Sequence, residues 1–315
     1  MRRQEFLAMH RASVFWYVIG TIIIQLSVAF YVDLQSIAVR DPEYILVESI
    51  LKARRADRPT SPVILALGSS RTLYGLDAGW FTQSGGEKGP LVINGGMIGS
   101  GAILNYVALQ RLLTAECRPD LILLEVLPMG LSARNGCQNE ERWSFQHRYS
   151  ASEVGNAWNC LDQPYRLVYR WGRARVLPCI FHHDGLRQNM GIDLNTGAHM
   201  RTARDAFGWR EVDDIVTPAE LARRVHYDIS TNHAALTEPA LSPGAVHASR
   251  TLLQRCRDAH IPVILVVPPE STAFRGHSPG TRESQVNAVR DLATEFNLCC
   301  ALATKFARFS WVDSA

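Results

Sequence analysis

The residues best suited to covalent chemistry directly follow a short apolar run. The run is Val63–Leu67, and residues 68–72 after it read GSSRT. A serine on a tight strand-to-helix turn exposes its hydroxyl, and the backbone N–H groups beside it can face a developing oxyanion. The pattern therefore predicts a serine nucleophile at this turn. An ordinary turn in which a serine caps the following helix is the alternative.

A glycine-rich segment follows a second apolar run. Residues 94–101 read NGGMIGSG and come directly after Leu91–Ile93. Glycines let the backbone approach a ligand closely and leave N–H donors uncovered by side chains. A phosphate-binding loop is the alternative, but the spacing matches neither the G-x-G-x-x-G fingerprint nor a P-loop. We therefore expect this segment to supply backbone donors to a reaction centre.

Carboxylate and imidazole candidates lie elsewhere in the chain. Asp313 stands in the final residues, WVDSA, the third segment that could contribute to the crevice; a solvated residue near a terminus is the alternative. Residues 182–184 read HHD, but adjacent histidines point apart and no third ligand is suitably spaced, so we expect a surface loop rather than a metal site. If the chain is complete, His226, His233 and His277 are the remaining candidates for the base that accepts the proton of the serine.

The elements that must position these residues form a repeated pattern of apolar runs and helical stripes. Continuous apolar runs separated by helical patterns are typical of parallel strands buried on both faces. Right-handed crossovers then predict a three-layer α/β/α sandwich of flavodoxin-like type, with its active crevice outside the carboxyl ends of the strands. The expected strands are Val63–Leu67, Leu91–Ile93, Leu121–Leu127, Val263–Val267 and Leu298–Leu302, and the expected helices are Ala102–Thr114, Ala245–Ala259 and Thr281–Phe296.

Two stretches depart from this pattern. Residues 33–62 are mixed and charged, and we expect a solvated connector there, followed by an α/β domain over residues 63–315. Residues 130–240 contain no clear strand, although Pro164–Arg175 and Pro218–Val225 have helical character. We interpret residues 130–240 as an insertion that sits over the carboxyl ends of the strands.

The N-terminal region contains an apolar segment long enough to cross a bilayer. Val14–Val32 has 19 residues without a charge, about 28 Å as a helix. Arginines precede it, so the positive-inside rule predicts cytoplasmic residues 1–13, a single transmembrane helix over 14–32 and an extracytoplasmic main domain. A cleavable signal peptide and a buried core helix are the alternatives, but the run exceeds the usual apolar length of a signal peptide.

Composition narrows the class of protein. The chain has 315 residues, 47% of them hydrophobic and 20% charged, which excludes a disordered or fibrous protein. With 33 basic and 30 acidic residues, the net charge of +3 gives no reason to expect a nucleic-acid partner. Seven cysteines at irregular spacing favour neither a zinc ribbon nor a dense disulfide scaffold, although Cys137 and Cys160 are a candidate pair in an oxidising compartment.

These motifs together resemble the SGNH/GDSL hydrolase superfamily. LALGSSRTLYGLD is similar to its first block, VINGGMIGSG to its second, and RPDLILLEVLP to the strand that carries its third. The resemblance implies that Ser70 is the nucleophile and that the backbone N–H groups of Ser70 and Gly99 form the oxyanion hole. The GSSR form with an N-terminal anchor is similar to membrane-bound members that move acyl groups in the cell envelope.

The sequence departs from the family pattern in two places. The third block of the family ends in Gly-x-Asn, whose Asn donates to the oxyanion, whereas Leu127-Pro128-Met129 stands here. Asp313 fits the Asp of the family's Asp-x-x-His block, but the His would be the residue after Ala315. Because a serine hydroxyl needs a base to take its proton, we expect the 315-residue chain to be a fragment that is nearly inactive alone.

The sequence thus predicts a membrane-anchored SGNH-type serine esterase or O-acyltransferase. Its substrate would be an extracytoplasmic acyl ester on an envelope glycan or a lipid-linked group, bound with contributions from Arg71, Asn94 and Gly96, and no metal or cofactor is implied. Ser70 and Asp313 would be catalytic. A non-catalytic SGNH-like scaffold in a complex with envelope proteins is the alternative, favoured by the missing Asn and His.

Overall fold

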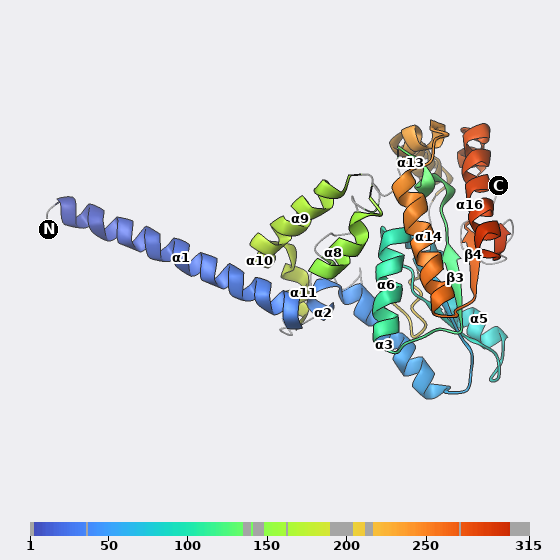
Figure 1. The fold of residues 1–315 in the computed structure, drawn as a ribbon, viewed down its shortest axis with the longest axis horizontal. Helices are drawn as coiled ribbons and strands as arrows, with labels where there is room; N and C mark the ends of the chain where they lie inside the picture. The colour runs from blue at the N-terminus through green and yellow to red at the C-terminus, as the bar shows by residue number, and fades with distance from the viewer. Residues whose placement is uncertain are drawn as a thin grey trace.

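The structure is a computed structural model that describes residues 3–35, 37–134, 140, 148–161, 163–189, 204–211, 217–270 and 272–302. One long helix extends from a body in which helices flank a sheet (Figure 1). All strand pairs are parallel, and the strand order is β2-β1-β3-β4-β5. The strands are β1 (Val63–Leu67), β2 (Leu91–Asn94), β3 (Leu121–Glu125), β4 (Val263–Val267) and β5 (Cys299–Leu302).

The apolar runs form these strands because both faces of the sheet are covered. Leu65 in β1, an inner strand, is fully buried and pairs with Ile93 on one side and Ile122 on the other. The predicted three-layer α/β/α sandwich with a parallel sheet is confirmed. Strand β3 ends at Glu125, earlier than predicted, because the chain turns into a 3₁₀ helix, η1 (Pro128–Leu131), at Pro128, which has no N–H to donate to a strand ladder.

The helices form two layers. The connection from β1 to β2 runs across the sheet in one direction, and the later connections run in the other. Because such connections are right-handed, the helices after β1 cover one face of the sheet and the helices of the later connections cover the other. The first group is α4 (Ser70–Gly75) and α5 (Ala78–Ser84); the second is α6 (Ala102–Thr114), α14 (Pro243–Asp258), α15 (Thr272–Gly276) and α16 (Pro279–Phe296).

Residues 33–62 differ from the predicted solvated connector. They include α2 (Ile37–Arg40) and α3 (Pro42–Asp57), and α3 buries Tyr44, Val47 and Leu51 in the main core. These three residues recur every three or four positions and therefore share one face of the helix. The charged residues 52–58, KARRADR, obscure that pattern in the sequence, since their side chains occupy the outer face and the end of α3.

A buried ionic network joins α3 to the rest of the domain. Arg111 of α6 contacts Asp41 at 2.7 Å and Glu153 of α8 (Ala151–Trp158) at 2.7 Å. Arg148 contacts Glu43 at 2.7 Å. Burial alone would raise the pKa of Asp41, but Arg148 and Arg111 hold it below its usual 3.8. The N-terminus of α3, where Asp41 is the cap, is therefore fixed to α6 and α8.

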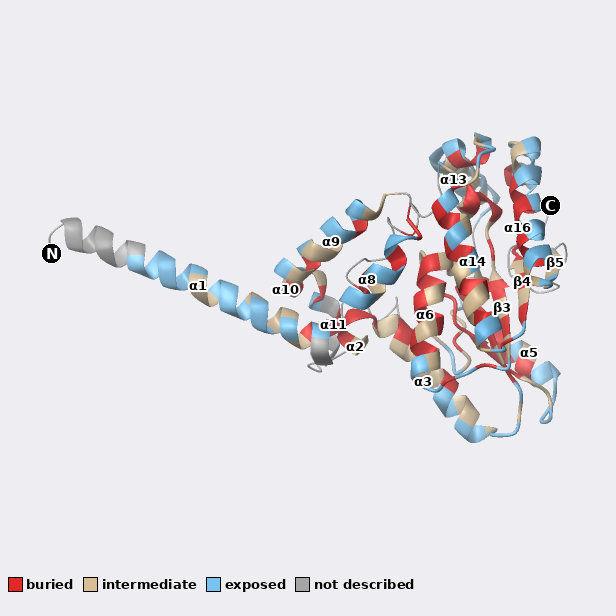
Figure 2. Ribbon diagram, viewed as in Figure 1, coloured by how far each residue is buried: buried red, intermediate tan, exposed pale blue. Residues whose placement is uncertain are grey.

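The long helix is α1 (Arg3–Gln35), which contains the predicted apolar segment. Ala12–Asp33 has a mean hydropathy of 1.9, and its most apolar 18-residue stretch is not buried inside the protein, although Val32 near the end is buried. Figure 2 shows the corresponding exposed surface along most of α1. Length and composition make α1 compatible with a single-pass membrane anchor.

The predicted insertion divides into parts with different positions. Helices α9 (Pro164–Val176), α10 (Pro178–Phe181) and α11 (His183–Asn189) pack beside α1 and α2 and not over the strand ends. Helix α13 (Pro218–Thr237), longer than predicted, packs against η1, α15 and α16. Because η1 directly follows β3, this part does lie near the carboxyl ends of the strands.

A short segment of the insertion, residues 204–211, crosses the end of β2. Phe207 accepts a hydrogen bond from the backbone N–H of Asn94 at 2.8 Å, and Arg210 donates its backbone N–H to Leu73 at 3.2 Å. Gly208 has a φ of +87°, and a Cβ there would lie 2.2 Å from the carbonyl oxygen of Asn94. A glycine is therefore required for this close approach.

Candidate active site

The two adjacent serines after β1 have different environments. Ser69 is buried and caps α4, accepting a hydrogen bond from the backbone N–H of Arg71 at 3.2 Å. Its hydroxyl donates to Glu125 Oε1 at 2.6 Å. The alternative of a serine helix cap thus applies to Ser69, and its hydroxyl is engaged in holding the turn together.

Ser70 is the first residue of α4 and is partly exposed to a cavity. Among the residues that the structure describes, no group hydrogen-bonds to its hydroxyl. The backbone N–H groups of Ser69, Arg71 and Thr72 at this turn are already hydrogen-bonded, so among the described residues the N–H of Ser70 itself is the donor left to face negative charge that develops beside its hydroxyl. The geometry is suitable for a nucleophile whose proton is taken by a base.

Glu125, at the end of β3, holds this turn in place. Besides the hydroxyl of Ser69, its carboxylate accepts hydrogen bonds from the backbone N–H groups of Ser69 and Thr72, both at 3.0 Å, and from the hydroxyl of Thr72. A Cβ on Gly68 would lie 2.5 Å from Glu125 Oε2, so only glycine leaves room for the carboxylate. The sequence analysis missed Glu125; the signal was an acid inside the apolar run LILLEVL.

The glycine-rich segment lies against the nucleophile turn. Gly95 and Met97 donate backbone N–H groups to Ala66 at 2.8 Å and to Gly68 at 2.9 Å. Gly99 has a φ of +71°, a left-handed conformation that favours glycine, and it lines the same cavity as Ser70. The segments that follow β1 and β2 therefore bring Ser70 and Gly99 to one cavity.

Asn94 and Gly96 lie behind the cavity. The fully buried Asn94 side chain donates to the carbonyls of Thr72 and Leu76, both at 2.8 Å, at the end of α4. A Cβ on Gly96 would lie 2.4 Å from the backbone nitrogen of Leu73. Neither residue lines the cavity, and both positions are explained by the close packing of α4.

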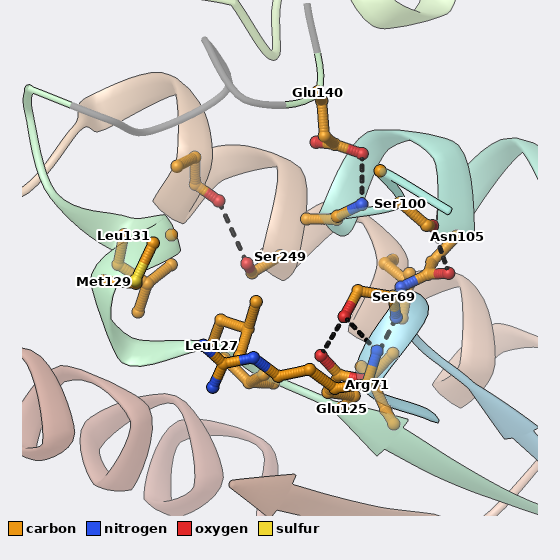
Figure 3. A pocket seen from close by; sticks show the side chains of 18 of the residues that line it. Ser69, Arg71, Ser100, Asn105, Glu125, Leu127, Met129, Leu131, Glu140 and Ser249 are labelled. Carbon is orange, nitrogen blue, oxygen red and sulfur yellow. Dashed lines mark hydrogen bonds between the residues drawn. The ribbon is translucent and has the colours of Figure 1, made fainter. Parts of the chain in front are cut away.

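The cavity has a volume of about 330 Å³, and its wall is largely apolar. Helices α6 and α14, strand β3 and the η1 turn all contribute to it. In Figure 3, Ser69, Arg71 and Glu125 lie together, while Met129 and Leu131 lie on the opposite side of the cavity from Asn105. The apolar lining residues are Ile98, Ala102, Leu124, Val126, Leu127, Met129, Leu131, Ala245 and Leu252.

Glu140 is a buried acid in the wall of this cavity. It accepts backbone hydrogen bonds from Gly101 at 2.7 Å, Leu104 at 2.9 Å and Ile103 at 3.1 Å, and so caps α6. Burial raises the pKa of Glu140 to about 7, although these three hydrogen bonds act in the opposite direction. Sequence analysis missed this cap because it comes from a distant part of the chain.

Arg71 lines the cavity next to Ser70. Its guanidinium lies over the ring of Phe274 in α15, 5.9 Å from the centroid. The remaining candidates for the base lie on the surface of this region: His233 and His277 are exposed and their ring nitrogens are 3.1 Å apart, and His226 is also exposed. None of the three lines the cavity.

The prediction of a surface loop at residues 182–184 is wrong, because His182 is buried at the end of α10 and His183 begins α11. Other predicted features fall outside the described residues or differ from the family pattern. Asp313 and Cys137 are not described, so the catalytic role of Asp313 and the Cys137–Cys160 pair remain predictions. Where the family has an Asn donor, Met129 of η1 contributes to the apolar wall. Within the described ranges, no three His, Cys, Asp or Glu side chains gather where they could hold a metal.

Comparisons with known proteins give limited similarity. No family model matches the chain, and no curated protein matches it. Among solved structures, the chain is similar to a mutant of the esterase AlinE4, with 13% identity, a TM-score of 0.32 and coverage of 76% of this chain and 75% of that chain.

Proposed function

We propose that this protein is a membrane-anchored serine esterase or O-acyltransferase of SGNH type. The single observation that carries the proposal is that Ser70 and Gly99, from different strand ends, line one largely apolar cavity. The motif resemblance supports the same two residues independently of the geometry. The substrate is an acyl ester outside the cytoplasm, on an envelope glycan or a lipid-linked group.

In this mechanism the hydroxyl oxygen of Ser70 attacks the acyl carbon. The backbone N–H groups of Ser70 and Gly99 donate to the oxyanion that forms. Asp313 orients a histidine that accepts the proton of Ser70 and then passes it to the departing alcohol. Water or a sugar hydroxyl, deprotonated by the same histidine, then attacks the acyl-enzyme and releases Ser70.

The cavity wall supports an acyl group as the part of the substrate that is enclosed. A volume of about 330 Å³ equals roughly eleven water molecules at their liquid volume, and the apolar side chains in the wall match a hydrocarbon chain better than a sugar. Arg71, beside the nucleophile, is placed to attract an anionic acceptor or leaving group. Glu125 and Glu140 hold the two backbone turns and are positioning residues.

The test is labelling of the protein, expressed from its complete reading frame and in its membrane, with a fluorophosphonate probe. We expect the wild type and Ser249→Ala to be labelled and Ser70→Ala to be unlabelled. Ser249 is a matched control because it lines the same cavity while its hydroxyl is bonded to the carbonyl of Ala245 at 3.0 Å. Undiminished labelling of Ser70→Ala would overturn the proposal.

The second candidate function is a non-catalytic scaffold in an envelope complex. The observation that favours it is the apolar Leu127-Pro128-Met129 where the family has an oxyanion donor. A folded wild type that resists the probe entirely, with unchanged behaviour of Ser70→Ala in an envelope-integrity assay, would select the scaffold over the enzyme.

A further inference from the structure

A second apolar surface lies beside the N-terminal helix. Residues 176–181 read VLPCIF and join the end of α9 to α10. Although the side chains are apolar, Val176 is 68% exposed and Ile180 is 61% exposed. We call residues 164–181, which span α9 and α10, the α9–α10 unit.

Two polar contacts fix the α9–α10 unit along α1. Arg175, near the end of α9, pairs with Asp33 at 2.5 Å. Farther along, the backbone N–H of Cys179 in α10 donates to Gln25 at 3.5 Å. Gln25 and Asp33 are eight positions apart, so Cys179 contacts α1 about 12 Å farther toward its N-terminus than Arg175 does.

This position places α10 beside the apolar part of α1. If the bilayer ended at Gln25, the apolar stretch from Ala12 would contain about 13 residues, or roughly 20 Å of helix. A spanning helix needs at least about 17 residues. A bilayer that covers Ala12–Asp33, the apolar segment of α1, therefore also reaches the level of α10.

Helix α9 has the composition of a helix that lies at a membrane surface. It buries Leu167 and Ala174 against the protein, and Figure 1 shows its axis running across that of α1. Its outer surface carries exposed tyrosines and arginines, the residues that prefer the headgroup region. These residues are Tyr165, Arg166, Tyr169, Arg170 and Arg173.

We propose that the α9–α10 unit is a second membrane contact, in which α9 lies on the bilayer surface and Val176 and Ile180 enter the hydrocarbon beside α1. The proposal rests on the membrane anchor that forms part of the proposed function. It commits to lipid as the occupant because exposed Ile180 follows Cys179, which contacts the apolar part of α1 at Gln25, and exposed Val176 follows Arg175, which contacts the end of that segment at Asp33. Basic residues of α9 would contact anionic headgroups.

One consequence concerns the orientation of the main domain. A single helix lets a domain rotate and tilt freely about its anchor, whereas a second contact restricts it to one inclination. The cavity of Ser70 would then be held at a fixed height above the bilayer. This suits an acyl donor or acceptor that is itself confined to the membrane surface.

The test uses the full-length protein in vesicles of phosphatidylethanolamine and phosphatidylglycerol. A photoreactive p-benzoylphenylalanine replaces Ile180 or, in a separate protein, Val176; both side chains are exposed, so the fold tolerates the change. Ile24 in α1 is the reference position. Tyr227, 64% exposed on α13, is the matched control on the main domain. Mass spectrometry after irradiation identifies the adducts.

We expect a mass shift of one phospholipid at positions 176, 180 and 24, and none at position 227. Lipid adducts at 24 without any at 176 and 180 would overturn the second contact and leave the anchor intact. A protein cross-link at 180 in place of lipid would equally overturn it. No lipid adduct at 24 would refute the anchor and with it this proposal, while the fluorophosphonate result for Ser70 would stand separately.

Discussion

The hydroxyl of Ser69 donates to the carboxylate of Glu125 at 2.6 Å, and this contact fixes the turn on which Ser70 stands. The partners come from the ends of two neighbouring strands, β1 and β3. A carboxylate at the N-terminus of a helix also interacts favourably with the helix dipole. The turn that carries Ser70 is thus held by the sheet and not only by its own short helix.

Replacing Glu125 should loosen this turn. In Glu125→Ala, the backbone N–H groups of Ser69 and Thr72 lose their acceptor, and we expect the free energy of unfolding to fall by roughly 3 kcal/mol. Urea denaturation of the protein in detergent measures this change. Glu295→Ala is the control, since Glu295 forms an exposed pair with Arg250 and should matter little. Equal stabilities of the two variants would contradict the role of Glu125.

Gly99 should be sensitive to a single added methyl group. An alanine at a φ of +71° costs roughly 1 kcal/mol and shifts the amide, so we expect the fluorophosphonate labelling rate of Gly99→Ala to fall roughly 10²-fold to 10³-fold. Gly130→Ala is a matched control in the same cavity wall, because its Cβ would meet its nearest neighbour at an ordinary 3.7 Å. Comparable rates for both variants would argue against a donor at position 99.

Glu140 should make stability depend on pH near neutrality. Burial raises its pKa from 4.5 to about 7, so the folded protein retains a proton that the unfolded chain has lost. The unfolding free energy of the wild type should therefore fall, relative to Glu140→Gln, as pH rises from 4.5 to 7, and level off above that. The full difference is roughly 3 kcal/mol. Denaturation curves of both proteins at several pH values test this, and parallel pH profiles would refute it.

Asp41 should be essential for the ionic network at the start of α3. Asp41→Asn leaves Arg111 and Arg148 buried without this counter-charge, so we expect a loss of roughly 3–5 kcal/mol in unfolding free energy. Because folding lowers the pKa of Asp41, the ionised carboxylate contributes to the unfolding free energy above pH 3.8, and this contribution is lost as pH falls further. Chemical denaturation measures both effects. Asp57→Asn, at an exposed pair with Arg54, should stay close to wild type.

The parts of the fold that depend on the local spacing of apolar residues could be predicted from the sequence. The run VILAL became β1 and Ala102–Thr114 became α6 with the predicted bounds, because strands buried on both faces and amphipathic helices have distinct apolar periods. Helix α3 was not predicted, since its three buried residues are embedded in a strongly charged stretch.

The supports of the candidate site could not be predicted in the same way. Glu125 and Glu140 each cap a helix from a remote part of the chain, and no local spacing connects Glu140 to Gly101. Asn94 was expected to contact substrate, but a buried amide that satisfies carbonyls of α4 has the same sequence signature as a binding residue. Only the three-dimensional packing distinguishes the two roles.

The docking of residues 204–211 has a consequence for how the protein behaves beside other copies of itself. Strand β2 is the first strand in the sheet order, and an uncovered edge strand can recruit a strand from another molecule. The bond between Asn94 and Phe207 occupies part of that edge, and it depends on the close approach that Gly208 permits. A bulkier residue at position 208 would therefore leave the N–H of Asn94 unpaired at this edge and free to pair with a strand of another molecule.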